Sequence, residues 1–206
     1  MRYVCRYIDA EDGFFDWKDF EVNYLRDVVT GEKPRLKTRF RACWTRDSLH
    51  IRFECEDDHV VATMARRDDP IYLEDVVEIF VDTIGSGTVY YEFEVSPRNV
   101  VFDALIYNSL DGNKEVDVSW DAKGMYTEVF DEVDGWRIYN LRIPFADLEL
   151  EQERMLKPHH GVEWRWNLYR IDDDPEGNRH YWAWSPTGKV DFHMPQRFGT
   201  LVFVKE

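Results

Sequence analysis

The sequence consists largely of short segments in which apolar and polar residues alternate, and this pattern restricts the fold more than any other feature. Apolar side chains occupy every second position in residues 40–44 and again in residues 49–55. A two-residue period places these side chains on one face of a half-buried β-strand. The other strand-like segments are rich in β-branched and apolar residues, and they cover residues 75–82, 89–95, 99–107, 136–143, 164–171, 181–184 and 198–204.

Glycine, proline, asparagine and aspartate punctuate the sequence between these segments, as is typical of turns. Two stretches, Val60–Arg66 and Ala146–Leu156, have the composition of short helices. Many strands at short spacing predict an all-β fold, an antiparallel, jelly-roll-like β-sandwich with one or two short helices. No repeat or linker is visible, so residues 1–206 are expected to form a single domain.

The charge of the chain narrows the choice of partners. With 26 Lys and Arg against 41 Asp and Glu, the net charge is −15. Nucleic acids and anionic membranes both attract clustered basic residues, so neither is an expected partner. No apolar run approaches the ~20 residues that span a bilayer. Residues 1–10 lack the apolar region of a signal peptide, so the chain is expected to be cytoplasmic, or secreted if a leader has been removed.

Three cysteines, Cys5, Cys43 and Cys55, cannot form a closed set of disulfides. If residues 39–55 form a hairpin, Cys43 lies opposite Ile51 or Arg52, and its sulfur is on the order of 10 Å from that of Cys55. That separation exceeds what a disulfide can bridge. The three thiols are therefore expected to be reduced and mostly buried, which favours an intracellular chain.

One carboxylate stands out among the 41 acids. Glu78 lies in the middle of residues 75–82, a segment apolar enough to be buried on both faces. A buried carboxylate needs a partner or access to a polar pocket. Two interpretations remain open, since an arginine on a neighbouring strand would hold Glu78 equally well.

Two acidic clusters are candidates for a structural calcium site, one containing Asp57 and Asp58 and the other containing Asp172 and Asp174. In residues 172–183, oxygen-bearing side chains alternate as they do in a calcium-binding loop. The last position is an alanine, however, where a bidentate glutamate is required. A solvated acidic turn is therefore the simpler interpretation of residues 172–178.

Aromatic residues make up 16% of the chain. Such rings fill the core first, and about half are expected to do so, but they are also surfaces on which sugar rings stack. Tyr72 and Phe192 lie in loop-like stretches, where a ring has less reason to be buried completely. Two loop rings that face each other across a slot can hold a sugar by its apolar faces. Neighbouring acids, His193 or arginine would then bond the sugar hydroxyls.

The order and spacing of several segments resemble those of the family 9 carbohydrate-binding modules and their relatives in the DOMON-like superfamily. The resemblance covers nearly the whole chain, and its segments are residues 44–51, 56–58, 69–82, 91–95, 136–145, 166–170, 184–186 and 191–199. It implies a non-catalytic β-sandwich domain that binds carbohydrate, often with bound calcium. The characterised members hold the end of a cellulose or xylan chain between two tryptophan rings.

The positions that match those two rings are Tyr72 and Phe192, and the family's hydrogen-bonding glutamate matches Glu78. Glu94 stands where the family has an arginine. The resemblance implies a glucose- or xylose-type ligand stacked on the two rings. Its hydroxyls would be bonded by Glu78, Glu94, His193 and Arg170.

Three other hypotheses remain open. The fold could be a structural or protein-interaction module in which Tyr72 and Phe192 pack against each other. It could be a small glycoside-processing enzyme with Glu78 and Glu94 as its carboxylates. It could also bind haem, as some DOMON relatives do, through His59 and Met194. No catalytic motif supports an enzyme over a binding module.

Overall fold

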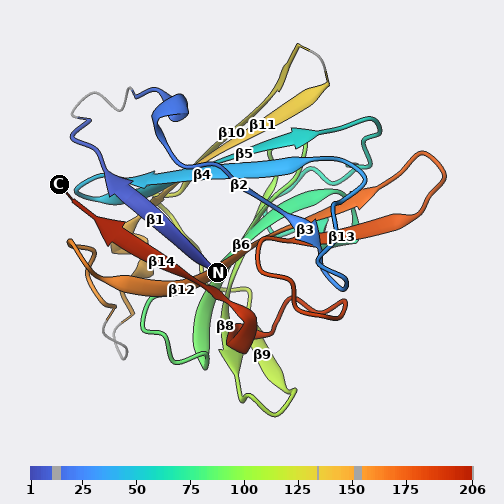
Figure 1. Ribbon diagram of the computed structural model, residues 1–206. Coiled ribbons are helices and arrows are strands. Elements are labelled where there is room, and N and C mark those ends of the chain that lie inside the picture. The colour runs from blue at the N-terminus through green and yellow to red at the C-terminus, as the bar shows by residue number, and fades with distance from the viewer. Residues whose placement is uncertain (11–14, 134, 151–154, 206) are drawn as a thin grey trace.

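The computed structural model describes residues 1–10, 15–133, 135–150 and 155–205, and almost all of its regular structure is β-strand (Figure 1). The strands are β1 (Arg2–Tyr7), β2 (Asn23–Tyr24), β3 (Arg26–Asp27), β4 (Thr38–Trp44), β5 (Ser48–Glu56), β6 (Val76–Asp82), β7 (Val89–Val95), β8 (Val101–Asn108), β9 (Lys114–Asp117), β10 (Tyr126–Glu132), β11 (Trp136–Pro144), β12 (Glu163–Asp173), β13 (Arg179–Ala183) and β14 (Gly199–Val204).

The strands join in one continuous, curled sheet with the order β10-β11-β5-β4-β1-β14-β12-β6-β7-β8-β9. Most neighbours are antiparallel, as the sequence predicts, but β1 runs parallel to both β14 and β4. The sheet is therefore mixed rather than purely antiparallel. This curled arrangement confirms the prediction of an all-β, sandwich-like fold.

The predicted hairpin of β4 and β5 is present, with a register different from the one expected. Cys43 lies opposite His50, one residue before the predicted partners. All three cysteines are buried and free, as predicted.

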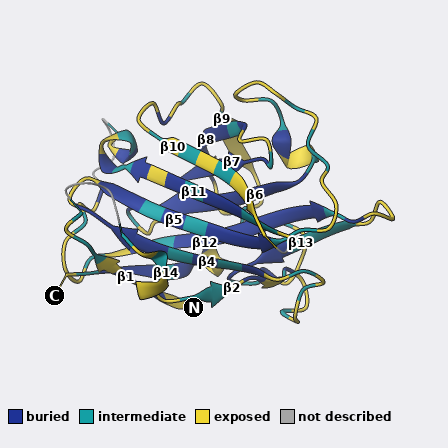
Figure 2. Cartoon of the chain, turned by 90° about the horizontal axis from the view of Figure 1, so that it is seen from above, coloured by how far each residue is buried: buried dark blue, intermediate teal, exposed yellow. Residues whose placement is uncertain are grey.

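Alternation along the strands divides the apolar residues between two clusters. In β6, Val77 and Ile79 point into the main core, where the indoles of Trp166 and Trp184 also pack. Phe80, on the opposite face of β6, belongs to a second cluster that loops cover. Buried residues accordingly run along the central strands, and exposed residues gather at the turns (Figure 2). All seven residues of β6 are buried, which explains its nearly continuous apolar sequence.

The predicted helices are the main error in the secondary structure. Among the described residues only single 3₁₀ turns occur: η1 (Trp17–Asp19), η2 (Ile71–Leu73), η3 (Phe145–Leu148) and η4 (Pro195–Arg197). Ala146–Leu156 begins inside η3, which ends where Glu149 becomes extended, and residues 151–154 lie outside the described residues. No described helix has the length and apolar content to cross a bilayer.

Val60–Arg66 contains no helix because acidic side chains take its backbone amides. The Asp75 carboxylate accepts from the Val61 amide at 2.7 Å, and the Glu74 carboxylate accepts from the Thr63 amide at 2.6 Å. The segment is thereby held extended beside η2, where it helps to position the loop that carries Tyr72.

Candidate functional site

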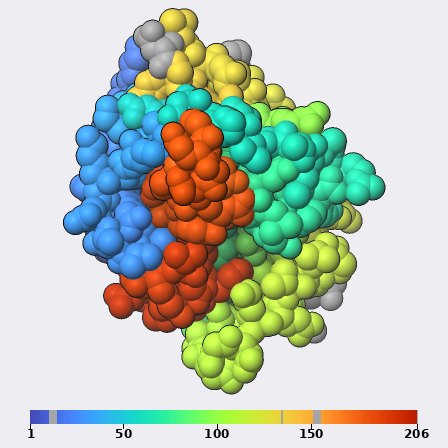
Figure 3. Space-filling model, turned by 90° about the vertical axis from the view of Figure 1, so that its right-hand side faces the viewer, coloured from blue at the N-terminus to red at the C-terminus, as the bar shows by residue number. Residues whose placement is uncertain are grey.

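A pocket of about 570 Å³ opens on the outer face of β6, β7 and β8, away from the main core. We refer to it as the acidic pocket. Its residues come from η2, the sheet, β9 and the loop before η4, and they are Tyr72, Glu78, Glu92, Glu94, Phe102, Lys114, Val116, Val118, Ile171, Tyr181, Val190, Asp191, Phe192 and His193. The teal, yellow-green and orange-to-red segments that carry its walls surround a hollow on the face shown in Figure 3.

Tyr72 forms one wall of the acidic pocket and is 42% exposed. Its ring packs edge-on against Phe102, with 5.7 Å between the ring centroids. The backbone of η2 is fixed from β13, since Arg179 donates to the carbonyl oxygens of Tyr72 and Leu73. Arg179 is itself held by Asp173 at 2.8 Å. The Tyr72 ring is therefore exposed while its backbone is restrained.

Phe192 forms another wall, and it is fixed more firmly. Its ring stacks on Tyr169 with the centroids 4.1 Å apart and the planes inclined by 11°. The Tyr169 hydroxyl also donates to the Phe192 carbonyl at 2.9 Å. Among the described ring contacts none joins Tyr72 to Phe192. The hypothesis that these two rings close the pocket by packing together therefore lacks support.

His193 continues the loop that carries Phe192. Its Nδ1 lies 2.9 Å from the Tyr90 hydroxyl, and its backbone amide donates to Asp191 at 3.0 Å. Burial, together with the nearby charge of Lys114, lowers the pKa of His193 to about 4. The imidazole is therefore neutral at neutral pH, and its contact with Tyr90 fixes its orientation.

Three glutamates form the floor of the acidic pocket. Glu78 in β6 lies directly opposite Glu94 in β7, and Glu92 shares the face of Glu94 because it is two residues away. Carboxylate oxygens of the three residues lie within 4.8 Å of one another. The neighbour of Glu78 on β12 is Tyr169 rather than an arginine. Of the two interpretations of Glu78, the structure therefore supports the pocket.

These three glutamates form no salt bridge with any described residue, although Lys114 lines the same pocket. Glu78 Oε1 and both carboxylate oxygens of Glu94 are buried and accept no hydrogen bond. Burial raises the pKa values of Glu78 and Glu94 well above the usual range, and the neighbouring carboxylates raise them further. Burial also raises the pKa of Glu92, to about 7. The three glutamates therefore stay protonated at pH values above 4, where an ordinary glutamate has lost its proton.

Arg170, expected from the sequence to bond a ligand beside these residues, lies elsewhere. It is adjacent to Tyr169 in β12, so its side chain points to the opposite face of the sheet. There it donates to Thr38 Oγ1 at 3.1 Å and to the Glu56 carbonyl at 2.8 Å, and it pairs with Asp172. Its guanidinium also lies over the Trp182 ring. Arg170 is a buried structural residue and does not line the acidic pocket.

The four acids proposed from the sequence as calcium ligands do not gather into a metal site. Asp57 pairs with Arg137, and Asp58 and Asp172 both pair with Arg35. Asp174 accepts from His180 and from turn amides. These carboxylates already have cationic or amide partners, so they do not fit a calcium ion. A further cluster, Asp68, Asp103 and Asp121, surrounds the guanidinium of Arg67.

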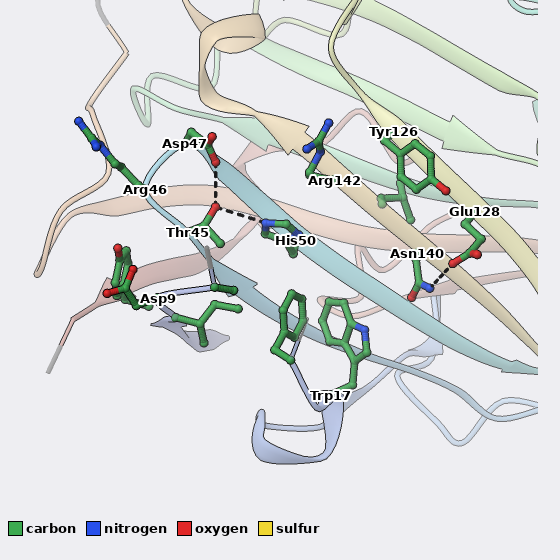
Figure 4. Close-up of a pocket in the computed structure, with 15 residues that line it drawn as sticks. Asp9, Trp17, Thr45, Arg46, Asp47, His50, Tyr126, Glu128, Asn140 and Arg142 are labelled. Carbon is green, nitrogen blue, oxygen red and sulfur yellow. Dashed lines mark hydrogen bonds between the residues drawn. The ribbon is translucent and has the colours of Figure 1, made fainter. Parts of the chain in front are cut away.

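A second, larger groove of about 770 Å³ lies where η1 approaches β5, β10 and β11 (Figure 4). Trp17 and Tyr126 contribute rings to it, and Asn140 bonds Glu128 at 3.0 Å. Arg52 lies over the face of Trp17, 5.2 Å from its centroid. Thr45 Oγ1 donates to Asp47 at 3.0 Å, whereas the side chains of Arg46 and Arg142 make no hydrogen bond with the described residues. This groove therefore also offers free polar groups, and it serves as the comparison site for the acidic pocket.

The structure does not bring the expected haem ligands together. His59 lines a separate groove with Asp58, Trp136 and Arg137, and Met194 does not line that groove. His193, the other histidine near Met194, has its Nδ1 beside Tyr90. The haem hypothesis therefore has no supporting geometry among the described residues.

The structure thus brings together five of the six residues expected at the site: Tyr72, Phe192, Glu78, Glu94 and His193. Sequence reasoning missed Glu92 and Lys114. Glu92 had a visible signal, because it shares a strand and a face with Glu94 in the alternating segment 89–95. Lys114 had none, since only the pairing of β8 with β9 brings it to this face.

Residues 9–206 match the family described as carbohydrate family 9 binding domain-like. A protein of Arthroderma benhamiae named "Extracellular protein" is 27% identical over 191 residues, which cover 86% of this chain and 83% of that protein. Two solved structures of a family 9 carbohydrate-binding module from Caldicellulosiruptor kristjanssonii, one with glucose and one with cellotriose, share the fold. Each has a TM-score of 0.71 and 19% identity and covers all of this chain, which in turn covers 97% and 95% of those chains.

Proposed function

Because the chain belongs to the carbohydrate family 9 binding domain-like family, we propose that it binds a glucose-type sugar in the acidic pocket without cleaving it. The observation that carries this proposal is the pair of rings, Tyr72 and Phe192, that line one open pocket above buried, unpaired carboxyl groups. The two solved relatives hold glucose and cellotriose, which supports the same ligand class for this chain.

The chemistry of the pocket suits a sugar. The apolar face of a pyranose ring can stack on an aromatic ring, and its hydroxyls need polar partners that water would otherwise supply. Protonated Glu78 and Glu94 can each donate one hydrogen bond and accept others. Phe192 is held by Tyr169 before any ligand arrives, so little of the binding free energy is spent on ordering that wall.

We propose binding rather than hydrolysis because burial disfavours the ionised form of Glu78 and Glu94, the two carboxyl groups that a hydrolytic mechanism would use. Glycosidases need one carboxylate in its charged form beside a protonated one. Burial and mutual repulsion raise the pKa of both Glu78 and Glu94. Cellotriose incubated with the protein should therefore stay intact, and release of glucose that is lost in Glu78→Gln would refute this part of the proposal.

We further propose that residues 1–206 act as one sugar-binding domain outside the cell. The first part rests on the single continuous sheet. The second rests on the Arthroderma relative, which is named an extracellular protein. Detection of the protein only inside the cells that make it would contradict the second part.

Isothermal titration calorimetry with cellotriose and glucose tests the site. Wild type and Tyr72→Ala are compared with Tyr126→Ala, which removes an exposed ring of the same kind from the larger groove. We expect saturable binding by wild type and Tyr126→Ala, and a loss of about tenfold or more in affinity for Tyr72→Ala, equivalent to ~1.4 kcal/mol. Unchanged affinity in Tyr72→Ala would refute the assignment.

A further inference from the structure

The charges around the acidic pocket are unbalanced. Asp191 at its rim is paired with Lys189 at 3.0 Å, and His193 is neutral near pH 7. Lys114 is the one lysine or arginine among the described lining residues, and it makes no ion pair. Glu78, Glu92 and Glu94 therefore face the pocket without a salt-bridge partner among the described residues.

These buried, unpaired carboxyl groups destabilise the folded protein unless a ligand supplies hydrogen bonds to them. A buried carboxyl group that accepts no hydrogen bond loses its hydration without compensation. The unpaired oxygens belong to Glu78, which is 2% exposed, and to Glu94, which is 0% exposed. A sugar hydroxyl would satisfy one or two of these oxygens, but it brings no positive charge for the cluster.

The spacing of the three carboxylates suits an ammonium group. Three acceptors that each lie ~2.8 Å from one tetrahedral nitrogen are ~4.6 Å from each other. Each of the three glutamates has one carboxylate oxygen that lies within 4.8 Å of those of the other two, a limit that includes this spacing. The ammonium group has three N–H donors, one for each carboxylate.

We propose that the acidic pocket selects an amino sugar, with a 2-amino-2-deoxyhexose such as glucosamine, free or in a β-1,4-linked chain, bound through its ammonium group to Glu78, Glu92 and Glu94. This inference rests on the proposed sugar-binding function and deepens it. The ring of the sugar lies along the walls that carry Tyr72 and Phe192, and the amine takes the place of one hydroxyl. A neutral hexose of the same size binds more weakly.

The walls favour an organic cation over a bare metal ion. Calcium requires six to eight oxygen ligands, and the floor supplies three carboxyl groups. The other lining residues include the side chains of Phe102, Phe192 and Val116, which offer no oxygen ligand, and one further carboxylate, Asp191, which Lys189 already pairs. A sugar with an ammonium group can bind the carboxyl groups of the floor and pack its apolar ring against the walls, whereas a metal ion can interact with the floor alone.

The test compares three ligands that share one ring: glucosamine, glucose and N-acetylglucosamine, the last with its nitrogen uncharged. Calorimetric titration of the wild type at about pH 7 should give glucosamine an affinity about tenfold or more above that of glucose. The preference should shrink as salt is added, because screening weakens the attraction between charges.

Two isosteric variants, Glu94→Gln and Glu78→Gln, keep the shape of the floor and each remove a carboxyl group that can release its proton when an ammonium group binds. Each should lower the affinity for glucosamine about tenfold more than it lowers the affinity for glucose, so that the preference for glucosamine is lost. Glu128→Gln, in the larger groove, is the matched control and should change neither. Melting curves identify any variant that fails to fold, and Glu92→Gln then replaces it.

The outcomes separate the inference from the function on which it rests. If glucose binds as tightly as glucosamine, the selectivity is refuted and sugar binding stands. If no sugar binds, both are refuted. If glucosamine is preferred equally by the wild type and by Glu94→Gln, the assignment to these glutamates is wrong. Titration with calcium or manganese chloride alone completes the set, since saturable binding that Glu94→Gln abolishes would make the cluster a metal site instead.

Discussion

The burial of Glu92 makes the stability of this protein depend on pH in a direction opposite to that of an ordinary salt-bridged acid. Burial raises the pKa of Glu92 from 4.5 to about 7. Between these values the folded protein binds more protons than the unfolded chain, so its stability is greatest at low pH and falls as the pH rises through about 7. The difference between the two pKa values corresponds to about 3 kcal/mol, at ~1.4 kcal/mol for each pH unit.

Replacing Glu92 with glutamine removes the ionisation and leaves the shape of the side chain. Above about pH 8 the variant should therefore be more stable than the wild type by about 3 kcal/mol. For a domain of this size that is a rise in melting temperature of roughly 6–12 °C. Near about pH 3, where Glu92 is protonated in both the folded and the unfolded state, this advantage should vanish.

The assay is thermal unfolding of both proteins without ligand, followed by circular dichroism across this pH range. His50 and His193 have pKa values lowered to about 4, so they make the stability rise between about pH 4 and 6.5. Both proteins contain them, so their effect cancels in the comparison. Glu115→Gln, an exposed position on β9, is the control and should change little at any pH. A stability difference that does not vary with pH would refute the reasoning.

Three further expectations follow from the packing. Arg170→Leu should lower the free energy of unfolding by about 3–5 kcal/mol in urea titrations, because it leaves buried acids without their cationic partner. A loss below about 1 kcal/mol would contradict the structural role given to Arg170. Phe192→Ala should lower the free energy of unfolding by about 3–5 kcal/mol, whereas Tyr72→Ala, which removes an exposed ring, should lower it far less. Equal losses of stability in the two variants would contradict the difference in burial between the two rings. Gly199→Ala should destabilise by roughly 1–3 kcal/mol or more, because its Cβ would overlap the Trp184 indole, and an unchanged melting temperature would show that this contact relaxes easily.

The strands were predictable because their signal is local. Alternation in residues 49–55 marks the buried face of β5 without knowledge of its partners. The continuous apolar run around Glu78 likewise indicates a strand buried on both faces. Whether Glu78 meets an arginine or a pocket depends on the neighbouring strands, and the pairing of β6 with β12 and β7 decides it.

The errors concern contacts between residues far apart in the chain. Alternation in β12 requires that Tyr169 and Arg170 point to opposite faces, but only the sheet order shows that Tyr169 shares the face of Glu78. The structure does not support the predicted calcium sites for a similar reason. Arg35, which neutralises Asp172, is 137 positions away in the sequence and gave no local signal of the pair. The predicted helix at Val60–Arg66 does not form because its backbone amides donate to Glu74 and Asp75, in the loop before β6.

The central claim is that sugar enters the acidic pocket rather than the larger groove, and hydrogen–deuterium exchange with and without saturating cellotriose or glucosamine tests it most directly. We expect added protection of backbone amides in η2, in β7 and in residues 190–193, which carry the walls and floor of the acidic pocket. Amides around Trp17 and Tyr126, in the larger groove, should exchange at unchanged rates. Protection confined to the larger groove would contradict the account.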